Sequence, residues 1–365
     1  MKGISMLNPT PIVEDFDETR ALAFMDQMGA VINSGAISVM LSVGHRSGLF
    51  EIMNDSKAET AEQIARTANL NARYVREWLS ALAVSNIVEF DPARQTFRLP
   101  KEHAACLTRT GILGNMAGFA QAVPVMGAIE NRILECLETG EGTTYADYPC
   151  FHSFMVDAGS GVLANLFDGV LPLVPGLHDR LNNGIDVMDA GCGMGRILNA
   201  LAKRYPQSRF TGYDLCEDVI DQARREAANA GVTNIRFEAR DLTGYHEPKA
   251  FDLVTSFDAV HDQQDPFGLV KSMHTALKPG GIYLMQDVGG SAFLENNYEF
   301  PFAPFLYSIS LTHCTPVSIG QGGPGLGTMW GWETAEDMLE KAGFSDIKRS
   351  VLDFDPLSVW FVSQV

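Results

Sequence analysis

The sequence predicts an α/β protein whose second half is a doubly wound, seven-stranded sheet and whose first part is mainly helical. A short apolar run at 185–190 reads as a buried strand, and a helical pattern follows at 196–205. Between them, glycines stand at 191, 193 and 195. Strand, glycine turn and helix form the first unit of a nucleotide-binding sheet, whose ligands bind at the carboxyl end of that strand.

The glycine turn indicates which class of nucleotide the sheet does not bind. Gly191 and Gly193 can adopt positive φ, and because they lack Cβ a ligand can lie against their backbone. A dinucleotide fingerprint would place its third glycine at position 196, where this chain has Arg196. This spacing argues against an NAD-dependent oxidoreductase.

The strands after the turn end in chemically useful residues. The second strand, 209–214, ends in Asp214 about 20 residues past the glycines, the position of an acid that accepts from ribose hydroxyls. Three more strands are predicted at 234–239, 251–257 and 281–287. Two final strands follow at 346–352 and 357–362, and the last is expected to run antiparallel.

This ordered set resembles the class I S-adenosylmethionine (SAM)-dependent methyltransferases over residues 184–365, which implies a Rossmann-like sheet. It also implies SAM as cofactor and S-adenosylhomocysteine as product. The resemblance assigns cofactor contacts to the first loop and to the ends of the next three strands: Asp189, Gly191, Cys192, Gly193, Asp214, Leu215, Asp241, Leu242, Phe257 and Asp258. Stretches 73–79, 257–263 and 325–331 further resemble a microbial methyltransferase family with an N-terminal winged helix.

A winged helix is predicted between residues 48 and 103. Thr60 and Gln63 form a capping-box pattern before a short helix, and a second helix follows at 72–82. Two short strands at 87–90 and 96–99 complete the pattern. Charges over 46–102 balance at eight basic and eight acidic residues, which favours a dimerisation and packing module over DNA binding. A ligand-sensing transcriptional regulator, contacting DNA through Arg73 and Arg76, is the alternative.

The chain is expected to have three parts. Residues 1–105 hold an irregular arm to residue 17, a helix and the winged helix, and 106–183 form a helical connector that breaks near Pro124. Residues 184–365 form the methyltransferase domain. Its insertion, 288–332, has no clear regular structure, and long loops of this kind are often functional. It is either part of the acceptor pocket or a structural cap.

Composition restricts the partners and the compartment. The formal net charge of -18 argues against nucleic acid or an anionic membrane as the main partner. The six cysteines form no C-x-x-C pair, which favours reduced thiols in the cytoplasm. No run of 18 apolar residues and no signal-peptide pattern is present, so no membrane span is expected.

The acceptor side is predicted after the fourth strand, at His261 and Asp262. This pair resembles the His-Asp-Trp of small-molecule O-methyltransferases with a winged-helix dimerisation domain, in which the histidine is the general base; here Gln263 replaces the tryptophan. A carboxylate acceptor would need no base because it is already anionic at neutral pH. Candidate substrate contacts within the insertion are His313, Trp330, Tyr298 and Phe302.

No metal is expected, since the chain has no H-E-x-x-H motif and no cysteine cluster. The sequence thus predicts a cytoplasmic, homodimeric, SAM-dependent methyltransferase that acts on oxygen of a small molecule.

Overall fold

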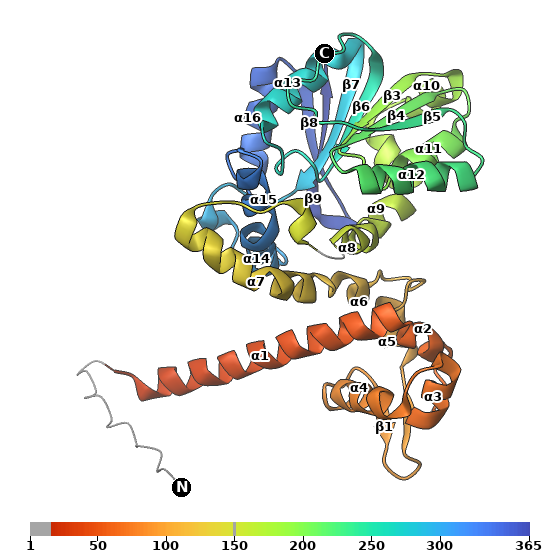
Figure 1. Ribbon diagram of the computed structural model, residues 1–365, viewed down its shortest axis with the longest axis vertical. Helices are drawn as coiled ribbons and strands as arrows, with labels where there is room; N and C mark the ends of the chain where they lie inside the picture. The colour runs from red at the N-terminus through yellow and green to blue at the C-terminus, as the bar shows by residue number, and fades with distance from the viewer. Residues whose placement is uncertain (1–15, 149–150) are drawn as a thin grey trace. The chain divides into compact units, whose positions relative to one another are not determined.

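The computed structural model describes residues 16–148 and 151–365, apart from the side chains of residues 152 and 153. Most of the arm predicted at 1–17 therefore lies outside the described residues. The chain divides into two compact units, Met1–Ala120 and Gln121–Val365 (Figure 1).

The first unit contains the predicted winged helix. Thr60 and Gln63 form both hydrogen bonds of the capping box at the start of α3. A core that includes Phe50, Trp78 and Leu82 joins its helices to the hairpin region. The elements after the long helix α1 (Glu18–Ser47) are α2 (Leu49–Ile52), η1 (Met53–Asp55), α3 (Ala61–Ala68), α4 (Ala72–Val84), β1 (Glu89–Asp91), β2 (Thr96–Arg98), α5 (Lys101–Leu107) and α6 (Met116–Phe119).

Helix α1 exposes much of its apolar surface. Asp17 caps its first turn by accepting from the backbone N of Arg20 at 3.0 Å. By length and composition alone α1 could cross a membrane, and 17% of its most apolar window is buried. Its exposed apolar side chains include Leu22, Phe24, Met25, Val31 and Ile32.

The second unit is built on a seven-stranded sheet in the order β5-β4-β3-β6-β7-β9-β8, in which only β9 runs antiparallel to the others. The predicted sheet is thereby confirmed. The strands are β3 (Asp186–Ala190), β4 (Arg209–Asp214), β5 (Ile235–Ala239), β6 (Phe251–Phe257), β7 (Leu277–Val288), β8 (Ser345–Leu352) and β9 (Asp355–Gln364).

Both faces of the sheet are buried. Alternate residues of one strand enter different cores: Val187 packs in one, and Met188 in the other. Sheets covered on both faces have strands that read as continuous apolar runs, which is why these strands could be recognised in the sequence. The flanking helices include α10 (Leu177–Asn183), α11 (Arg196–Arg204), α12 (Glu217–Asn229), α13 (Pro266–Ala276) and α16 (Trp332–Ala342).

The connector helix does not break at Pro124. Helix α7 (Ala122–Thr139) carries Pro124 in its first turn, where the missing N–H costs no internal hydrogen bond. The interruption lies earlier, between α5 and α6. The rest of the connector forms η2 (Tyr145–Asp147), α8 (Phe151–Ala158), α9 (Ser160–Ala164), η3 (Leu166–Val170) and η4 (Leu171–Leu173).

About half of the insertion after β7 is helical, so the expectation of no clear regular structure was wrong. Its helices are too short for an apolar period to show in the sequence. They are η5 (Leu294–Asn296), α14 (Ala303–Ile309), the π-helix η6 (Ser310–Cys314) and α15 (Thr315–Gly320). Helix α7 contacts both α14 and η6.

Candidate active site

The glycine turn after β3 adopts the backbone that the sequence predicts. Gly191 and Gly193 have φ of 78° and 51°. A Cβ on Gly191 would stand 2.5 Å from the Cβ of Ala259, whereas a Cβ on Gly193 would meet no atom within 4 Å. Gly193 therefore faces open space, where a ligand can approach the backbone.

Asp214 ties this turn to the end of β4. Its Oδ2 accepts from the backbone N of Gly193 at 2.9 Å, and its Oδ1 accepts from the backbone N of Cys216 at 3.0 Å. The half-buried carboxylate thus closes one side of the turn. Its predicted neighbour Leu215 is 48% exposed, and Cys192 is half-buried within the turn.

Asp189 lies buried beneath the turn. Its Oδ1 accepts from the hydroxyl of Thr255 at 2.7 Å. Burial raises the pKa of Asp189 to about 7; the hydrogen bond from Thr255 opposes this shift, and the charge of Asp214 adds to it. This carboxyl can change charge near neutral pH.

The turn after β5 places polar and aromatic groups together. Asp241 is exposed and accepts from the backbone N of Thr243 at 2.8 Å, while Leu242 is buried. Beside them Arg240, which sequence reasoning missed, lies over the rings of Tyr213 and Tyr245 at 5.4 and 4.7 Å.

The chain turns sharply after β6. Phe257 packs edge-on against Trp360. Asp258 follows with a left-handed φ of 54°, which is uncommon for residues other than glycine and marks functional turns. Burial raises the pKa of Asp258 to about 7, although the positive charge of His261 opposes the shift.

His261 and Asp262 lie in a buried cluster. His261 is 2% exposed; its Nδ1 lies 2.7 Å from Oδ1 of Asp287, and its Nε2 lies 3.2 Å from Oδ1 of Asp262. Burial lowers the pKa of His261, but the carboxylates of Asp287 and Asp262 outweigh this and hold the pKa well above its usual value. This shift favours the protonated form of the ring.

Two predicted residues of the insertion reach this cluster. Trp330 donates from Nε1 to Oδ1 of Asp287 at 3.0 Å. His313 is buried, with Nδ1 3.9 Å from Oδ2 of Asp262, and its ring stacks on Phe151 at 3.7 Å. Cys314, the next residue on the π-helix, accepts at Sγ from the hydroxyl of Thr328 at 3.1 Å. Single-turn π-helices are frequent at functional sites.

The other two predicted substrate residues face solvent. Tyr298 is 80% exposed and Phe302 is 47% exposed, so neither is buried with His313 and Trp330.

Sequence reasoning missed Asp287 and Tyr145. Asp287 ends the fifth strand, as Asp214 ends the second, and this signal could have been used. Tyr145 is half-buried; burial raises its pKa well above the usual value, and the carboxylates of Asp262 and Asp214 raise it further. The two carboxylates that raise this pKa belong to the end of β4 and to the cluster after β6.

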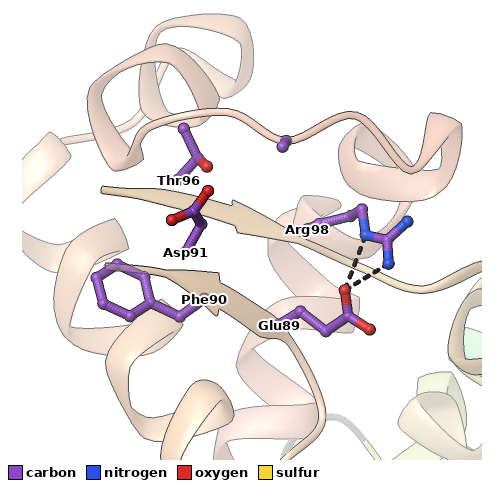
Figure 2. Close-up of a pocket in the computed structure, with 6 residues that line it drawn as sticks. Glu89, Phe90, Asp91, Thr96 and Arg98 are labelled. Atoms are coloured by element: carbon purple, nitrogen blue, oxygen red, sulfur yellow. Dashed lines mark hydrogen bonds and ion pairs between the residues drawn. The ribbon is translucent and has the colours of Figure 1, made fainter. Parts of the chain in front are cut away.

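Several exposed cations of the winged helix form ion pairs with acids. Arg73 pairs with Glu77 and Arg76 with Glu62, so the two candidate DNA contacts on α4 are neutralised. On the hairpin, Figure 2 shows Arg98 bound through two nitrogens to Glu89, at 2.9 and 2.5 Å, beside a shallow hollow.

Two family models match the chain. Residues 35–109 match a Rv2258c-like winged HTH domain, and residues 181–343 match a methyltransferase domain. The chain thus carries an N-terminal winged helix-turn-helix followed by a methyltransferase domain, as the sequence motifs predict.

Curated relatives match only part of the chain. The ubiquinone biosynthesis O-methyltransferase of Leptothrix cholodnii is 32% identical over 108 residues, which is 29% of this chain and 45% of the relative. The ubiquinone biosynthesis O-methyltransferase of Idiomarina loihiensis is 37% identical over 99 residues, which is 27% of this chain and 40% of the relative. The matches span less than half the length of these relatives.

Solved structures match nearly the whole chain in fold. Human N-acetylserotonin methyltransferase in complex with SAM has a TM-score of 0.67 at 14% identity, with 97% of this chain and 99% of that chain covered. An O-methyltransferase family protein from Burkholderia thailandensis has a TM-score of 0.65 at 15% identity, with 96% and 98% covered. PigF, solved with SAH, has a TM-score of 0.65 at 16% identity, with 96% and 100% covered.

Proposed function

We propose that this chain transfers a methyl group from SAM to an oxygen of a small molecule, either a hydroxyl or a carboxylate. The contact between Asp214 and the turn at Gly193 carries the proposal. It sets an acid at the end of β4 beside a glycine backbone that faces open space. That arrangement suits a nucleoside whose ribose hydroxyls are held by the acid.

SAM carries its methyl on a sulfonium, so transfer is an in-line displacement at carbon. The protein must align the acceptor oxygen, the methyl and the sulfur, and keep water away. The cluster of His261 and Asp262 follows β6, one strand beyond the glycine turn in the sheet, and is buried. We propose that these two residues meet the acceptor.

The cluster also has a place for the proton of a hydroxyl acceptor. The protonated ring of His261 neutralises part of the charge of Asp287 and Asp262. Oδ1 of Asp262 lies 3.2 Å from Nε2 of His261 without meeting hydrogen-bond geometry, and it is the carboxylate oxygen nearest the ring. Since the carboxylates favour the protonated ring of His261, the carboxylate of Asp262 would take the proton of a hydroxyl acceptor.

The surroundings of His313 favour an apolar acceptor. Tyr148 and Phe151 contact its ring at 4.6 and 3.7 Å, and both belong to an apolar cluster formed with α7. Small-molecule pockets are mostly apolar, with a few polar groups that fix orientation. An acceptor that presents one oxygen on an aromatic or aliphatic body fits this environment.

We further propose a cytoplasmic homodimer. Helix α1 exposes several large apolar side chains, and apolar patches on protein surfaces mark interaction sites. A second copy of this chain would cover it. The paired arginines of α4 support a winged helix that packs rather than binds DNA, and this speaks against a ligand-sensing regulator.

The decisive experiment follows radiolabelled methyl from SAM into pooled phenols, carboxylic acids and thiols. We expect label in the phenol or carboxylic acid pools and release of S-adenosylhomocysteine. Calorimetry that found tight NAD binding and no SAM binding would overturn the proposal. Label only in thiols would overturn the choice of oxygen.

A further inference from the structure

We propose that His261, Asp262 and Cys314 bind a divalent metal ion, most suitably Zn²⁺. A ring nitrogen of His261, a carboxylate oxygen of Asp262 and Sγ of Cys314 all lie within 4.8 Å of one another. The three residues are 2%, 8% and 7% exposed. A nitrogen, an oxygen and a sulfur ligand form a set that zinc accepts, whereas the thiol disfavours Mg²⁺ and Ca²⁺.

The one ligand distance that the geometry defines agrees with tetrahedral zinc. Zinc binds imidazole nitrogen and carboxylate oxygen at about 2.0–2.2 Å, so two such ligands stand about 3.3–3.5 Å apart in a tetrahedral site. Nε2 of His261 and Oδ1 of Asp262 are 3.2 Å apart. Sγ of Cys314 would be the third ligand, which leaves a fourth position for water or an acceptor oxygen.

The far nitrogen of His261 is held as in many metal sites. A ligating histidine usually gives its other N–H to a carboxylate, which fixes the ring and strengthens the ligand. Asp287 performs this role at 2.7 Å, and it is fully buried. Trp330 and the backbone N of Val288 donate to the same oxygen at 3.0 and 2.8 Å, so the carboxylate is itself fixed.

Buried carboxylate oxygens without hydrogen-bond partners are the second, independent observation. Oδ1 of Asp258, Oδ1 of Asp262 and Oδ2 of Asp287 are buried and have no hydrogen-bond partner among the described residues. In the described part of the chain, no lysine or arginine forms an ion pair with any of the three carboxylates. Buried polar groups without partners are rare in folded proteins, and a bound ion is one cause of such a vacancy. A divalent cation would supply the missing positive charge.

This inference does not depend on methyl transfer. A metal ion would replace protons that the cluster otherwise holds, because it binds deprotonated thiolate and imidazole. The proposed function describes the cluster with its protons, and the metal would give a second form of the same site.

The test is metal binding by the full chain, read without any activity assay. The chelator-treated protein is titrated with Zn²⁺ against a competing chelator, and its metal content is measured by mass spectrometry after desalting. Co²⁺ serves as the optical probe, since a thiolate ligand gives a charge-transfer band in the near ultraviolet. We expect one tightly bound metal per chain and a thiolate–cobalt band.

Three variants locate the ion. Cys314→Ser should abolish the cobalt–thiolate band and weaken zinc binding, and Asp262→Asn should weaken binding with the band retained. Asp287→Asn, which alters only the support of His261, should weaken binding by about 10–100-fold. Cys136→Ser, on the half-buried surface of α7, is the matched control and should change neither readout.

Failure to retain zinc against a chelator of micromolar affinity would overturn the proposal. Binding that Cys314→Ser and Asp262→Asn leave unchanged would overturn it too, because the metal would then sit elsewhere. Circular dichroism of each variant separates loss of ligand from loss of fold.

Discussion

Nδ1 of His261 lies 2.7 Å from Oδ1 of Asp287, and that oxygen also accepts from Nε1 of Trp330. The carboxylate therefore fixes the orientation of the imidazole and is itself fixed by the indole. This relation joins the loop after β6, the end of β7 and the insertion in one buried group. This buried group holds the ion pairs of His261 with Asp287 and Asp262.

Asp287→Asn tests whether Asp287 positions His261. The amide oxygen can keep the bonds from Trp330 and Val288, but it no longer carries the charge that holds the ring. We expect kcat to fall by about 10–100-fold, since charged hydrogen bonds contribute about 1.5–3 kcal/mol. The KM for SAM should stay near the wild-type value.

Trp330→Phe is the companion variant. It keeps the aromatic packing and removes one donor to Asp287, so a smaller loss of kcat is expected. Equal losses of kcat and of thermal stability in both variants would indicate a purely structural group and contradict the positioning role.

Asp214→Ala should weaken SAM binding by at least tenfold. The variant loses charged-acceptor hydrogen bonds to ribose, each worth about 1.5–3 kcal/mol, and tenfold corresponds to about 1.4 kcal/mol. It also releases the backbone N of Gly193 from its partner. Calorimetry measures the affinity. Asp218→Ala, at an exposed acid in the first turn of α12, is the control and should bind SAM normally. Unchanged affinity in a folded Asp214→Ala protein would refute the assignment.

The affinity for SAM should depend on pH through Asp189. In the empty site its pKa is raised to about 7, so the carboxyl is largely neutral below that pH and charged above it. We expect the ammonium of SAM to favour the charged form, so binding should lower the pKa of Asp189. Affinity for SAM should rise as pH increases from about 6 to about 7.5. Above that pH Asp189 is fully charged and should contribute no further increase.

Two variants isolate this effect by calorimetry. Asp189→Asn should bind SAM more weakly, and its affinity should no longer rise with pH. Any pH dependence that remains in this variant reports the titration of SAM itself. Thr255→Val removes the hydrogen bond that opposes the raised pKa, so the rise should move to higher pH. The same slope in wild type and Asp189→Asn would count against Asp189.

The sequence predicts the cofactor end better than the acceptor end, and the reason is physical. Asp189, Gly193 and Asp214 lie at the ends of strands that are buried on both faces, so an apolar run followed by a polar residue marks each one. Their meeting then follows from the parallel order of β3 and β4.

The partners of His261 depend on tertiary packing. Phe257 pairs with Gln286 across β6 and β7, which brings the residues after them to one edge of the sheet. This register could have been anticipated once both strands were placed, and Asp287 with it. Cys314 could not: it reaches the cluster on a π-helix in an insertion packed against α7, and no sequence period marks that arrangement.

The exposed face of α1 should be an interface between two copies of this chain. Met25 and Ile32 are 62% and 72% exposed in the single chain. A double variant, Met25→Glu with Ile32→Glu, should turn a dimer into a monomer in light scattering at micromolar concentration. Val351→Glu, at an equally exposed apolar position on the edge strand β8, should leave the dimer intact.

A wild-type monomer would contradict the dimer. Because α1 is long and apolar enough to enter a bilayer, sedimentation with neutral lipid vesicles is run in parallel. A monomer that sediments with vesicles would assign the helix to a membrane instead.

His261→Ala separates the two classes of acceptor. A hydroxyl must lose its proton as the methyl moves, and a positioned acid–base group contributes about 10²–10⁴ in rate to such a transfer. If the acceptor is a hydroxyl, the variant should lose kcat on that scale while its affinity for SAM stays near normal. A carboxylate acceptor is already anionic at neutral pH, so the loss should be smaller and should reflect positioning alone.

The two outcomes are resolved by comparing His261→Ala with Asp262→Asn on the same substrate. With a hydroxyl acceptor both variants should be impaired, because Asp262 takes the proton and His261 is its ion-pair partner. With a carboxylate acceptor Asp262→Asn should transfer at least as fast as wild type, since it removes a negative charge that repels the substrate. Wild-type turnover by His261→Ala on the true substrate would end the catalytic assignment of this residue for either acceptor.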